Sequence, residues 1–278
     1  MRCFQMDVNN KTNTYIIDGE SVRIVDQNIS WDQTLESMIS ASGRSWLQAR
    51  SEETNIVITD QTVRNAKCVI GSEGIVWGAG LNYKTHSNDL DTLQPNSAPG
   101  SYLRPRNSLI NNGEPIVIPS QSSRVTGEAE IGIVIGKSIK NQPLDKWTGN
   151  VAGLTTVLDM TAEDVIRENP RHIPWAKGFD SFCSLGPVVV SLDEFTSDSL
   201  EQLLVETRTD DGSIRTGVSS SMKYGMPFLV NYFSQGRTIP AGSVICTGTP
   251  GALALEDGLT VSASVSNVGR LTHPVVKG

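Results

Sequence analysis

The stretch TGEAEIGIVIGK, from Thr126 to Lys137, has the composition of a buried strand but begins with two acids. Side chains alternate along a strand, so Glu128 and Glu130 point to one face while Ala129 and Ile131 point to the other. Two carboxylates about 6.7 Å apart repel by roughly 2.5 kcal/mol at an effective dielectric of about 20, and burial adds a desolvation cost. A divalent cation would offset both costs. The alternative is an exposed strand end at which both acids face water.

A third acid stands in VAGLTTVLDMTAEDVIREN, where Asp159 lies at the expected change from strand to helix. From this place its side chain can reach back over a sheet. The alternative is helix capping, because TAED resembles a capping box and acids stabilise a helix start. Three carboxylates without a nearby His or Cys suit a hard cation, Mg²⁺ or Mn²⁺ rather than Ca²⁺, and leave positions for water and substrate. This layout predicts a catalytic metal site.

The composition of the chain argues against several classes of function. The 278 residues carry a formal net charge of -7, and no basic run is present, which argues against nucleic-acid or anionic-membrane binding. No apolar run is long enough to span a bilayer, so we expect a soluble, cytoplasmic protein with a small-molecule partner. The four cysteines form no CxxC pair, and most of them are expected to pack in the core.

The order of the predicted elements favours a β-rich α+β fold. Most segments are strand-like, WDQTLESMISA is a candidate helix, and helical periodicity is clearest in TAEDVIREN and SMKYGMPFLVNYF. Strands and helices do not alternate strictly, which disfavours a doubly wound sheet. We place a boundary near Ser72, between a small N-terminal α/β domain at residues 1–71 and a catalytic domain at residues 72–278. Residues 88–108 are rich in Asn, Ser, Pro and Asp, which predicts a mobile surface loop.

Five segments resemble motifs of the fumarylacetoacetate hydrolase family, in the same order and with similar spacing. They are GLNYKTHSND, GEAEIGIVIGK, VAGLTTVLDMTAED, WAKGFDSFCSLGP and GSVICTGTPGAL. The resemblance runs from about Gly78 to the C-terminus. It implies a mixed β-sandwich roll, usually a homodimer, that acts on β-diketo or α-keto acids with Mg²⁺ or Mn²⁺.

The resemblance also implies roles for individual residues. Glu128, Glu130 and Asp159 match the metal ligands. Residues matched to catalysis or substrate binding are Lys177 beside the substrate, His86 on a mobile lid with Asp89 as its partner, and Tyr83, Arg104 and Thr249 as substrate contacts. Without the resemblance, Lys177 would be read as a surface lysine and His86 as a loop residue. His172 and His273 match no role and are expected to be structural.

Three positions depart from the family pattern. Glu163 and Ile166 stand where an arginine and a glutamine commonly face the substrate, and Arg104 stands where lysine is usual. Because a carboxylate at Glu163 would repel a second carboxylate on the substrate, these departures predict a substrate with a neutral, partly apolar tail.

Three functions remain open from the sequence. The first is a hydrolase that cleaves a C–C bond of an acylpyruvate-like substrate, with His86 as the general base toward water and Lys177 as added positive charge. The second keeps the enolate chemistry without water attack, as in a decarboxylase, tautomerase or hydratase of an α-keto acid such as oxaloacetate. The third is a non-catalytic family member that binds only metal or ligand.

Overall fold

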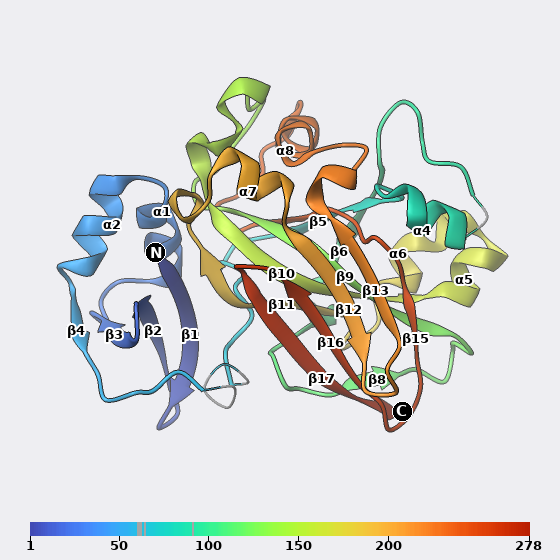
Figure 1. Cartoon of the computed structure of the whole chain (residues 1–278), viewed down its shortest axis with the longest axis horizontal. Coiled ribbons are helices and arrows are strands. Elements are labelled where there is room, and N and C mark those ends of the chain that lie inside the picture. The colour runs from blue at the N-terminus through green and yellow to red at the C-terminus, as the bar shows by residue number, and fades with distance from the viewer. Residues whose placement is uncertain (60–62, 64, 91) are drawn as a thin grey trace.

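The chain folds around two β-sheets, shown in Figure 1. The computed structural model describes residues 1–59, 63, 65–90 and 92–278. In these residues the larger sheet has twelve strands. Its main path runs β4 (Ser51–Glu53), β3 (Ser21–Val25), β2 (Lys11–Asp18), β1 (Arg2–Val8), β11 (Cys183–Val190), β10 (Val151–Ala162), β9 (Val125–Ile135), β14 (Val244–Cys246), β5 (Val76–Gly80) and β6 (Gly100–Arg104). In addition, β15 (Leu253–Leu255) pairs with β9, and β7 (Leu109–Ile110) pairs with β11.

The smaller sheet has five strands within the described ranges. Its order is β13 (Ile214–Val218), β12 (Leu204–Thr209), β16 (Thr260–Val265), β17 (Gly269–Lys277) and β8 (Ile116–Ile118). The pair β8 and β17 is parallel, as are β5 with β14 and β7 with β11, whereas the other pairs are antiparallel. Both sheets are therefore mixed, and the expected β-rich fold is confirmed.

Short helices cover the edges of this framework. The α-helices are α1 (Trp31–Met38), α2 (Ala41–Gln48), α4 (Lys84–Asp89), α5 (Glu163–Glu168), α6 (Ile173–Ala176), α7 (Ser197–Glu201) and α8 (Met226–Ser234). The 3-10 helices are η1 (Arg106–Ser108), η2 (Leu144–Asn150), η3 (Pro170–His172), η4 (Leu192–Glu194) and η5 (Ser219–Ser221), and η2 is kinked at Lys146. The three helices expected from periodicity are present as α1, α5 and α8. Of the helices described, none is long and apolar enough to cross a membrane.

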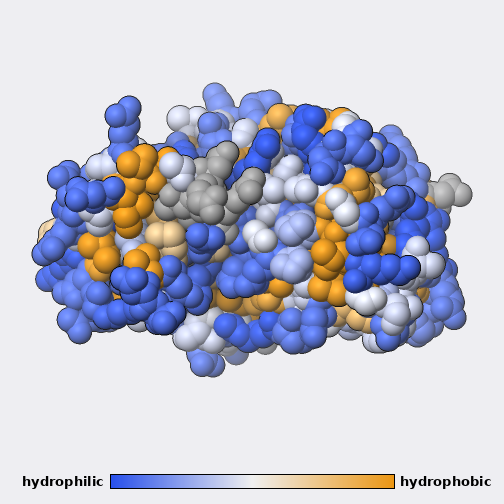
Figure 2. All heavy atoms as spheres, turned by 90° about the horizontal axis from the view of Figure 1, so that it is seen from below, coloured by the Kyte–Doolittle hydropathy of each residue, from blue (hydrophilic) through white to orange (hydrophobic). Residues whose placement is uncertain are grey.

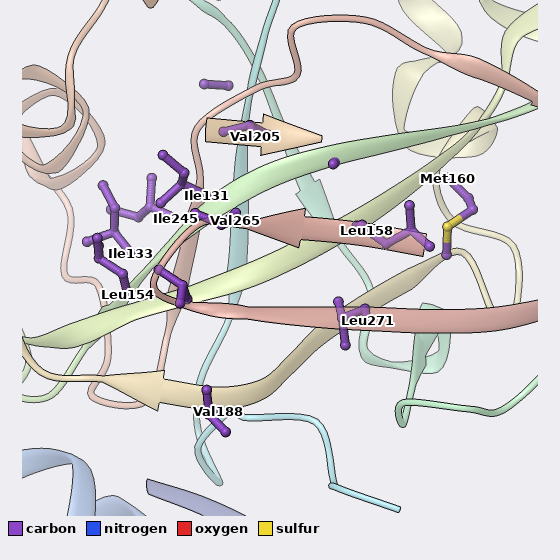
Figure 3. Packing of buried hydrophobic residues seen from close by; sticks show 14 of the residues in the cluster. Ile131, Ile133, Leu154, Leu158, Met160, Val188, Val205, Ile245, Val265 and Leu271 are labelled. Atoms are coloured by element: carbon purple, nitrogen blue, oxygen red, sulfur yellow. The ribbon is translucent and has the colours of Figure 1, made fainter. Parts of the chain in front are cut away.

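Strand β9 is buried on both faces along its whole length. On one face Ala129, Ile131 and Ile133 join the main hydrophobic cluster, in which β9 and β10 pack against residues of the smaller sheet such as Val265 and Leu271 (Figure 3). On the other face Val134 joins a second cluster beneath α1. Because α1 covers only that end, the opposite end of the same face is left for the two glutamates.

The N-terminal segment continues the larger sheet. Strand β1 pairs antiparallel with β11, with Arg2 opposite Val190, and the Met1 amino group donates to Ser191 Oγ at 2.8 Å. Strands β2 to β4 then extend the sheet outward, with α1 and α2 beside them (Figure 1). The boundary near Ser72 stays a prediction.

The prediction of a mobile surface loop at residues 88–108 is wrong for the second half of this segment. Residues 100–104 form β6, which pairs with β5 along five residues. Alternate residues of this strand face inward, so Tyr102 and Arg104 are buried.

The four cysteines are free, and Cys3, Cys183 and Cys246 are buried, as the sequence predicts. Figure 2 shows a face covered mostly by hydrophilic residues, with hydrophobic residues in separate patches.

Candidate active site

The three predicted acids meet where β9 and β10 run side by side. In the antiparallel register Asp159 lies opposite Glu128, and the next acid, Glu130, lies opposite Val157. One ligand oxygen from each of the three carboxylates lies within 4.8 Å of the others. The exposed fractions of Glu128, Glu130 and Asp159 are 6%, 2% and 0%. An exposed strand end is therefore excluded, and so is helix capping, because Asp159 lies inside β10 and α5 has no side-chain cap.

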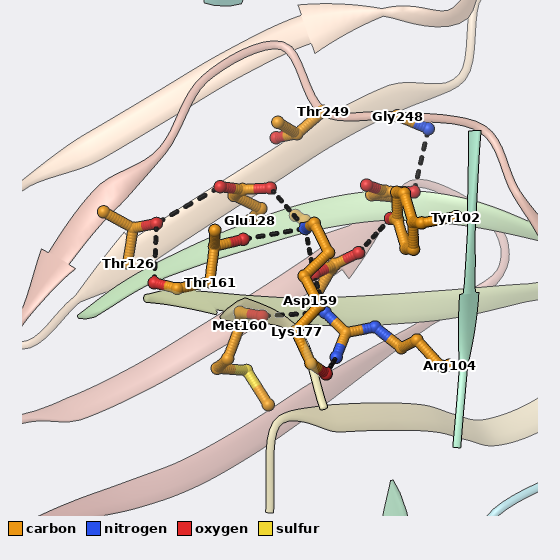
Figure 4. A network of polar contacts seen from close by, with 12 residues as sticks. Tyr102, Arg104, Thr126, Glu128, Asp159, Met160, Thr161, Lys177, Gly248 and Thr249 are labelled. Atoms are coloured by element: carbon orange, nitrogen blue, oxygen red, sulfur yellow. Dashed lines mark hydrogen bonds and ion pairs between the residues drawn. The ribbon is translucent and has the colours of Figure 1, made fainter. Parts of the chain in front are cut away.

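Three side chains donate hydrogen bonds to the Asp159 carboxylate (Figure 4). Arg104 Nη2 and Lys177 Nζ both donate to its Oδ1, the latter at 2.6 Å, and the Tyr102 hydroxyl donates to its Oδ2. Burial acts to raise the pKa of Asp159, but the positive charges of Arg104 and Lys177 hold it below its ordinary value. Asp159 is therefore ionised at neutral pH.

The two glutamates are less well compensated. Glu130 Oε2 accepts from the Gly248 amide at 2.8 Å, and in the described part of the chain no cationic side chain forms an ion pair with it. Burial, followed by repulsion from Asp159, raises the pKa of Glu130 well above its ordinary value. Glu128 has a hydroxyl partner, Thr126, at 3.2 Å and lies 3.5 Å from Lys177 Nζ.

The charge balance and the donor set both fit a divalent metal ion. The three carboxylates face two buried cations, Lys177 and Arg104, which leaves one negative charge in excess when all three are ionised. A buried excess charge costs several kcal/mol unless a counter-charge compensates it. Carboxylate oxygens are the ligands that hard divalent cations prefer. Glu128, Glu130 and Asp159 could therefore hold such an ion.

Lys177 follows α6 directly and is held against the triad. Its Nζ donates to Thr161 Oγ1 at 2.7 Å as well as to Asp159, and it lies 4.6 Å from the centre of the Tyr102 ring. Burial acts to lower the pKa of Lys177, but the neighbouring acids, Asp159 first, raise it above its ordinary value. The ammonium group is therefore charged, and the reading of Lys177 as a surface lysine is wrong.

A cavity of about 440 Å³ opens over the triad. Two of the acids, Glu128 and Glu130, line it together with Lys177. Residues from other elements complete the wall: Leu81, His86, Leu90, Tyr102, Thr161, Glu163, Ile166, Arg167, Pro170, Ile173, Gly248 and Thr249 are among them. The cavity is large enough for a small organic acid.

His86 lies in this wall, on α4, and is buried. Its Nδ1 has no hydrogen-bond partner in the portion of the chain that the structure describes. Asp89 does not provide one: its side chain is 43% exposed and its Oδ2 lies 3.7 Å from Arg215 Nε. The structure therefore brings His86 to the triad's cavity but does not pair it with Asp89.

The other predicted contacts fall into two groups. Thr249 lines the cavity, and its hydroxyl donates to the Gly251 carbonyl at 3.0 Å. Among the described residues, Tyr83 and Arg104 are not part of the cavity wall. Tyr83 is buried and its hydroxyl has no partner there, whereas Arg104 lies behind Asp159 and donates to the Met160 carbonyl at 2.7 Å.

Glu163 does not present an uncompensated charge to the cavity. Its carboxylate accepts from Arg124 Nε at 2.7 Å and from Arg167 Nε at 2.6 Å. The premise that Glu163 repels a second carboxylate is therefore wrong, because two arginines surround it.

Tyr102 and Arg167 were not found from the sequence. A signal exists for each, since Tyr102 shares a strand face with Arg104 and Arg167 lies one helical turn beyond Glu163.

Comparisons with known proteins identify the family. The family model described as Fumarylacetoacetate (FAA) hydrolase C-terminal matches residues 75–276. A mitochondrial oxaloacetate tautomerase of Arabidopsis thaliana is 29% identical, over 72% of this chain and 92% of its own. A mitochondrial oxaloacetate decarboxylase of Dictyostelium discoideum is 30% identical, over 68% of this chain and 87% of its own.

The fold agrees with this assignment. The structure of a fumarylacetoacetate hydrolase from the psychrophile Exiguobacterium antarcticum superposes with a TM-score of 0.82 over the full length of both chains, at 21% identity. The family match covers both strands that carry the triad, together with α4, Lys177 and Thr249. The chain therefore belongs to the fumarylacetoacetate hydrolase family.

Proposed function

We propose that this protein is a metal-dependent tautomerase of an α-keto acid such as oxaloacetate, which it interconverts between keto and enol forms. The observation that carries the proposal is that one cavity is lined by two acids of the buried triad, by a charged lysine and by a histidine whose Nδ1 has no partner in the described residues. Keto–enol interconversion needs a group that moves a proton at carbon and positive charge near the keto oxygen. The names of two relatives point to the same substrate.

Glu128, Glu130 and Asp159 would hold Mg²⁺ or Mn²⁺. When bound, this ion supplies Lewis-acid chemistry toward the oxygens of an α-keto acid. Arg104 donates to Oδ1 of Asp159 and Tyr102 donates to Oδ2, and these contacts fix the orientation of the carboxylate.

Lys177 and His86 would act on the substrate itself. The Lys177 ammonium places a positive charge beside the triad, where it stabilises negative charge that develops on the keto oxygen. His86 Nδ1, free of a protein partner in the described structure, takes the proton from the carbon next to the keto group and delivers it to the keto oxygen, and in the reverse direction it moves the proton back to carbon. Both groups are buried, which keeps bulk water away from the enol form.

Hydrolysis of a C–C bond in an acylpyruvate-like β-diketo acid is the second candidate. The position of His86 favours it, because a histidine in the cavity wall could deprotonate a water molecule. A contact with Asp89 that would orient the imidazole toward water is not formed in the described residues, and for this reason we rank hydrolysis second. A homodimer and a cytoplasmic location stay predictions.

The test follows the enol absorbance of oxaloacetate with Mg²⁺ or Mn²⁺ while released carbon dioxide is measured in parallel. We expect acceleration of the keto–enol exchange without carbon dioxide release. His86→Ala should lower kcat by roughly 100- to 10,000-fold, the usual contribution of a proton-transfer group. His172→Ala is the matched control, because His172 is exposed and bonded to Asn169.

Other outcomes would overturn the proposal. Carbon dioxide release at the rate of enol loss would mean a decarboxylase. Cleavage of an acylpyruvate without any effect on oxaloacetate would mean a hydrolase. A protein that binds Mn²⁺ but changes none of these substrates would be a non-catalytic member of the family.

A further inference from the structure

Glu163 forms a cluster with two arginines at the wall of the active-site cavity. One oxygen, Oε1, accepts from Nε of Arg167 at 2.6 Å and lies 2.5 Å from its Nη2. The other oxygen, Oε2, accepts from Arg124 Nε at 2.7 Å. The Glu163 side chain is 8% exposed, so a buried carboxylate holds both guanidinium groups.

The cluster carries a net positive charge with unused donors. Two guanidinium groups face one carboxylate, and each guanidinium has five N–H donors. Arg167 uses Nε and Nη2 on Glu163, and the structure gives Nη1 no partner in the residues that it describes. Since Arg167 stands on α5 four residues after Glu163, one helical turn, its orientation is fixed by its own helix.

Only one of the two arginines belongs to the cavity. Arg167 and Glu163 line the cavity together with Ile166. Among the described residues that form the cavity wall, Arg124 is absent. The alternative is an ordinary surface ion pair, since Arg167 is 54% exposed. That alternative leaves a positive group with free donors in the wall of a cavity that also holds the acid triad.

We propose that Arg167, positioned by Glu163, binds a second carboxylate at the distal end of the substrate. The inference rests on the proposed function, in which the α-keto acid head lies at the triad. It names the substrate class as dicarboxylic α-keto acids and makes Arg167 a specificity-determining residue. Guanidinium groups favour carboxylates because their planar donors match two oxygens. The substrate preference is therefore the reverse of the neutral tail expected from Glu163 alone.

The test compares two five-carbon α-keto acids that differ only at the distal end. α-Ketoglutarate ends in a carboxylate and α-ketovalerate ends in a methyl group. Their binding to Mn²⁺-loaded protein is measured by calorimetry and by inhibition of oxaloacetate turnover. We expect wild type to bind α-ketoglutarate more tightly by roughly 10- to 100-fold, the usual effect of a hydrogen bond between charged groups.

Arg167→Gln should remove this preference while binding of α-ketovalerate changes by no more than about twofold, because that ligand makes no charged contact. Arg167→Lys should restore part of it through charge alone. Arg124→Gln is the matched control: it removes an arginine from the same carboxylate but from outside the cavity wall, so the preference should persist. Circular dichroism confirms that each variant is folded.

The two proposals fail in different ways. Suppose that oxaloacetate is turned over and that Arg167→Gln weakens the binding of both ligands equally, or changes the binding of neither. Arg167 then does not bind the distal carboxylate, and this inference is wrong. If Arg167→Gln removes the preference but no α-keto acid is turned over, the anion site stands and the proposed tautomerase activity is wrong. If wild type binds neither ligand, Arg167 does not bind a distal carboxylate and this inference is wrong, whereas oxaloacetate turnover alone decides the tautomerase proposal.

Discussion

Two acidic clusters lie along one short piece of chain, and their charge balances are opposite. At the triad, Asp159 and the two glutamates exceed their buried cations by one charge when all three are ionised, whereas four residues later Glu163 is outnumbered by two arginines. The three acids of the triad are buried, but the side chains of Arg124 and Arg167 reach the solvent. The net charge of a site that contains an acid therefore depends on the charged side chains that surround the acid in the fold.

The largest effect should come from removing the cation that lies behind the triad. Arg104→Met removes one of the two cations that contact Asp159. It also removes the hydrogen bond that Arg104 donates to the Met160 carbonyl. Breaking a buried ion pair from one side typically costs about 3–5 kcal/mol. We expect a loss of this size in the free energy of unfolding, measured with urea on metal-free protein. A loss below about 1 kcal/mol would mean that the pair contributes no more than a surface contact.

His273 offers a comparison with a buried group outside both clusters. It lies on β17, and its Nδ1 lies 2.8 Å from the Glu114 carbonyl, while Nε2 has no partner in the described chain. Burial lowers the pKa of His273 from 6.5 to about 4, with hydrogen bonding to Glu114 acting in the other direction. The folded state therefore binds fewer protons than the unfolded state between these two values.

Stability from His273 should be present above pH 6.5 and lost as the pH falls toward 4. The total loss from this group is about 3 kcal/mol. Urea unfolding at several pH values should give a shallower decline for His273→Gln than for wild type. Parallel curves for the two proteins would exclude His273 as a source of the pH dependence.

The smallest effect should come from the solvent-facing side of the second cluster. Arg124→Met removes an ion pair that is half exposed, and Glu163 keeps Arg167 as a partner. The free energy of unfolding should fall by no more than about 1 kcal/mol, and by less in 1 M NaCl because salt screens exposed charges. A loss as large as that of Arg104→Met would remove the distinction between the clusters.

The sequence predicted the triad because the spacing of Glu128 and Glu130 on a strand determines that they share a face. It also predicted the fold class, since strand-like segments predominate and the five motifs occur in the same order as in the family. The partners of each charge could not be predicted in the same way. Arg104 reaches Asp159 only through the pairing of β6 with β5, and Asp89, on α4, lies near Arg215 on β13. Such contacts depend on long-range packing that local patterns do not contain.

The measurement that tests the central claim most directly is calorimetric titration of chelator-treated protein with Mn²⁺. We predict one ion per chain, and a loss of affinity on the order of 100-fold or more in Glu130→Gln, since even residues that only support metal ligands contribute 10- to 100-fold. Glu163→Gln is the matched control and should bind Mn²⁺ within about threefold of wild type, because this carboxylate lies outside the triad. If wild type takes up no Mn²⁺, or if Glu130→Gln binds it as tightly as wild type, the triad is not a metal site.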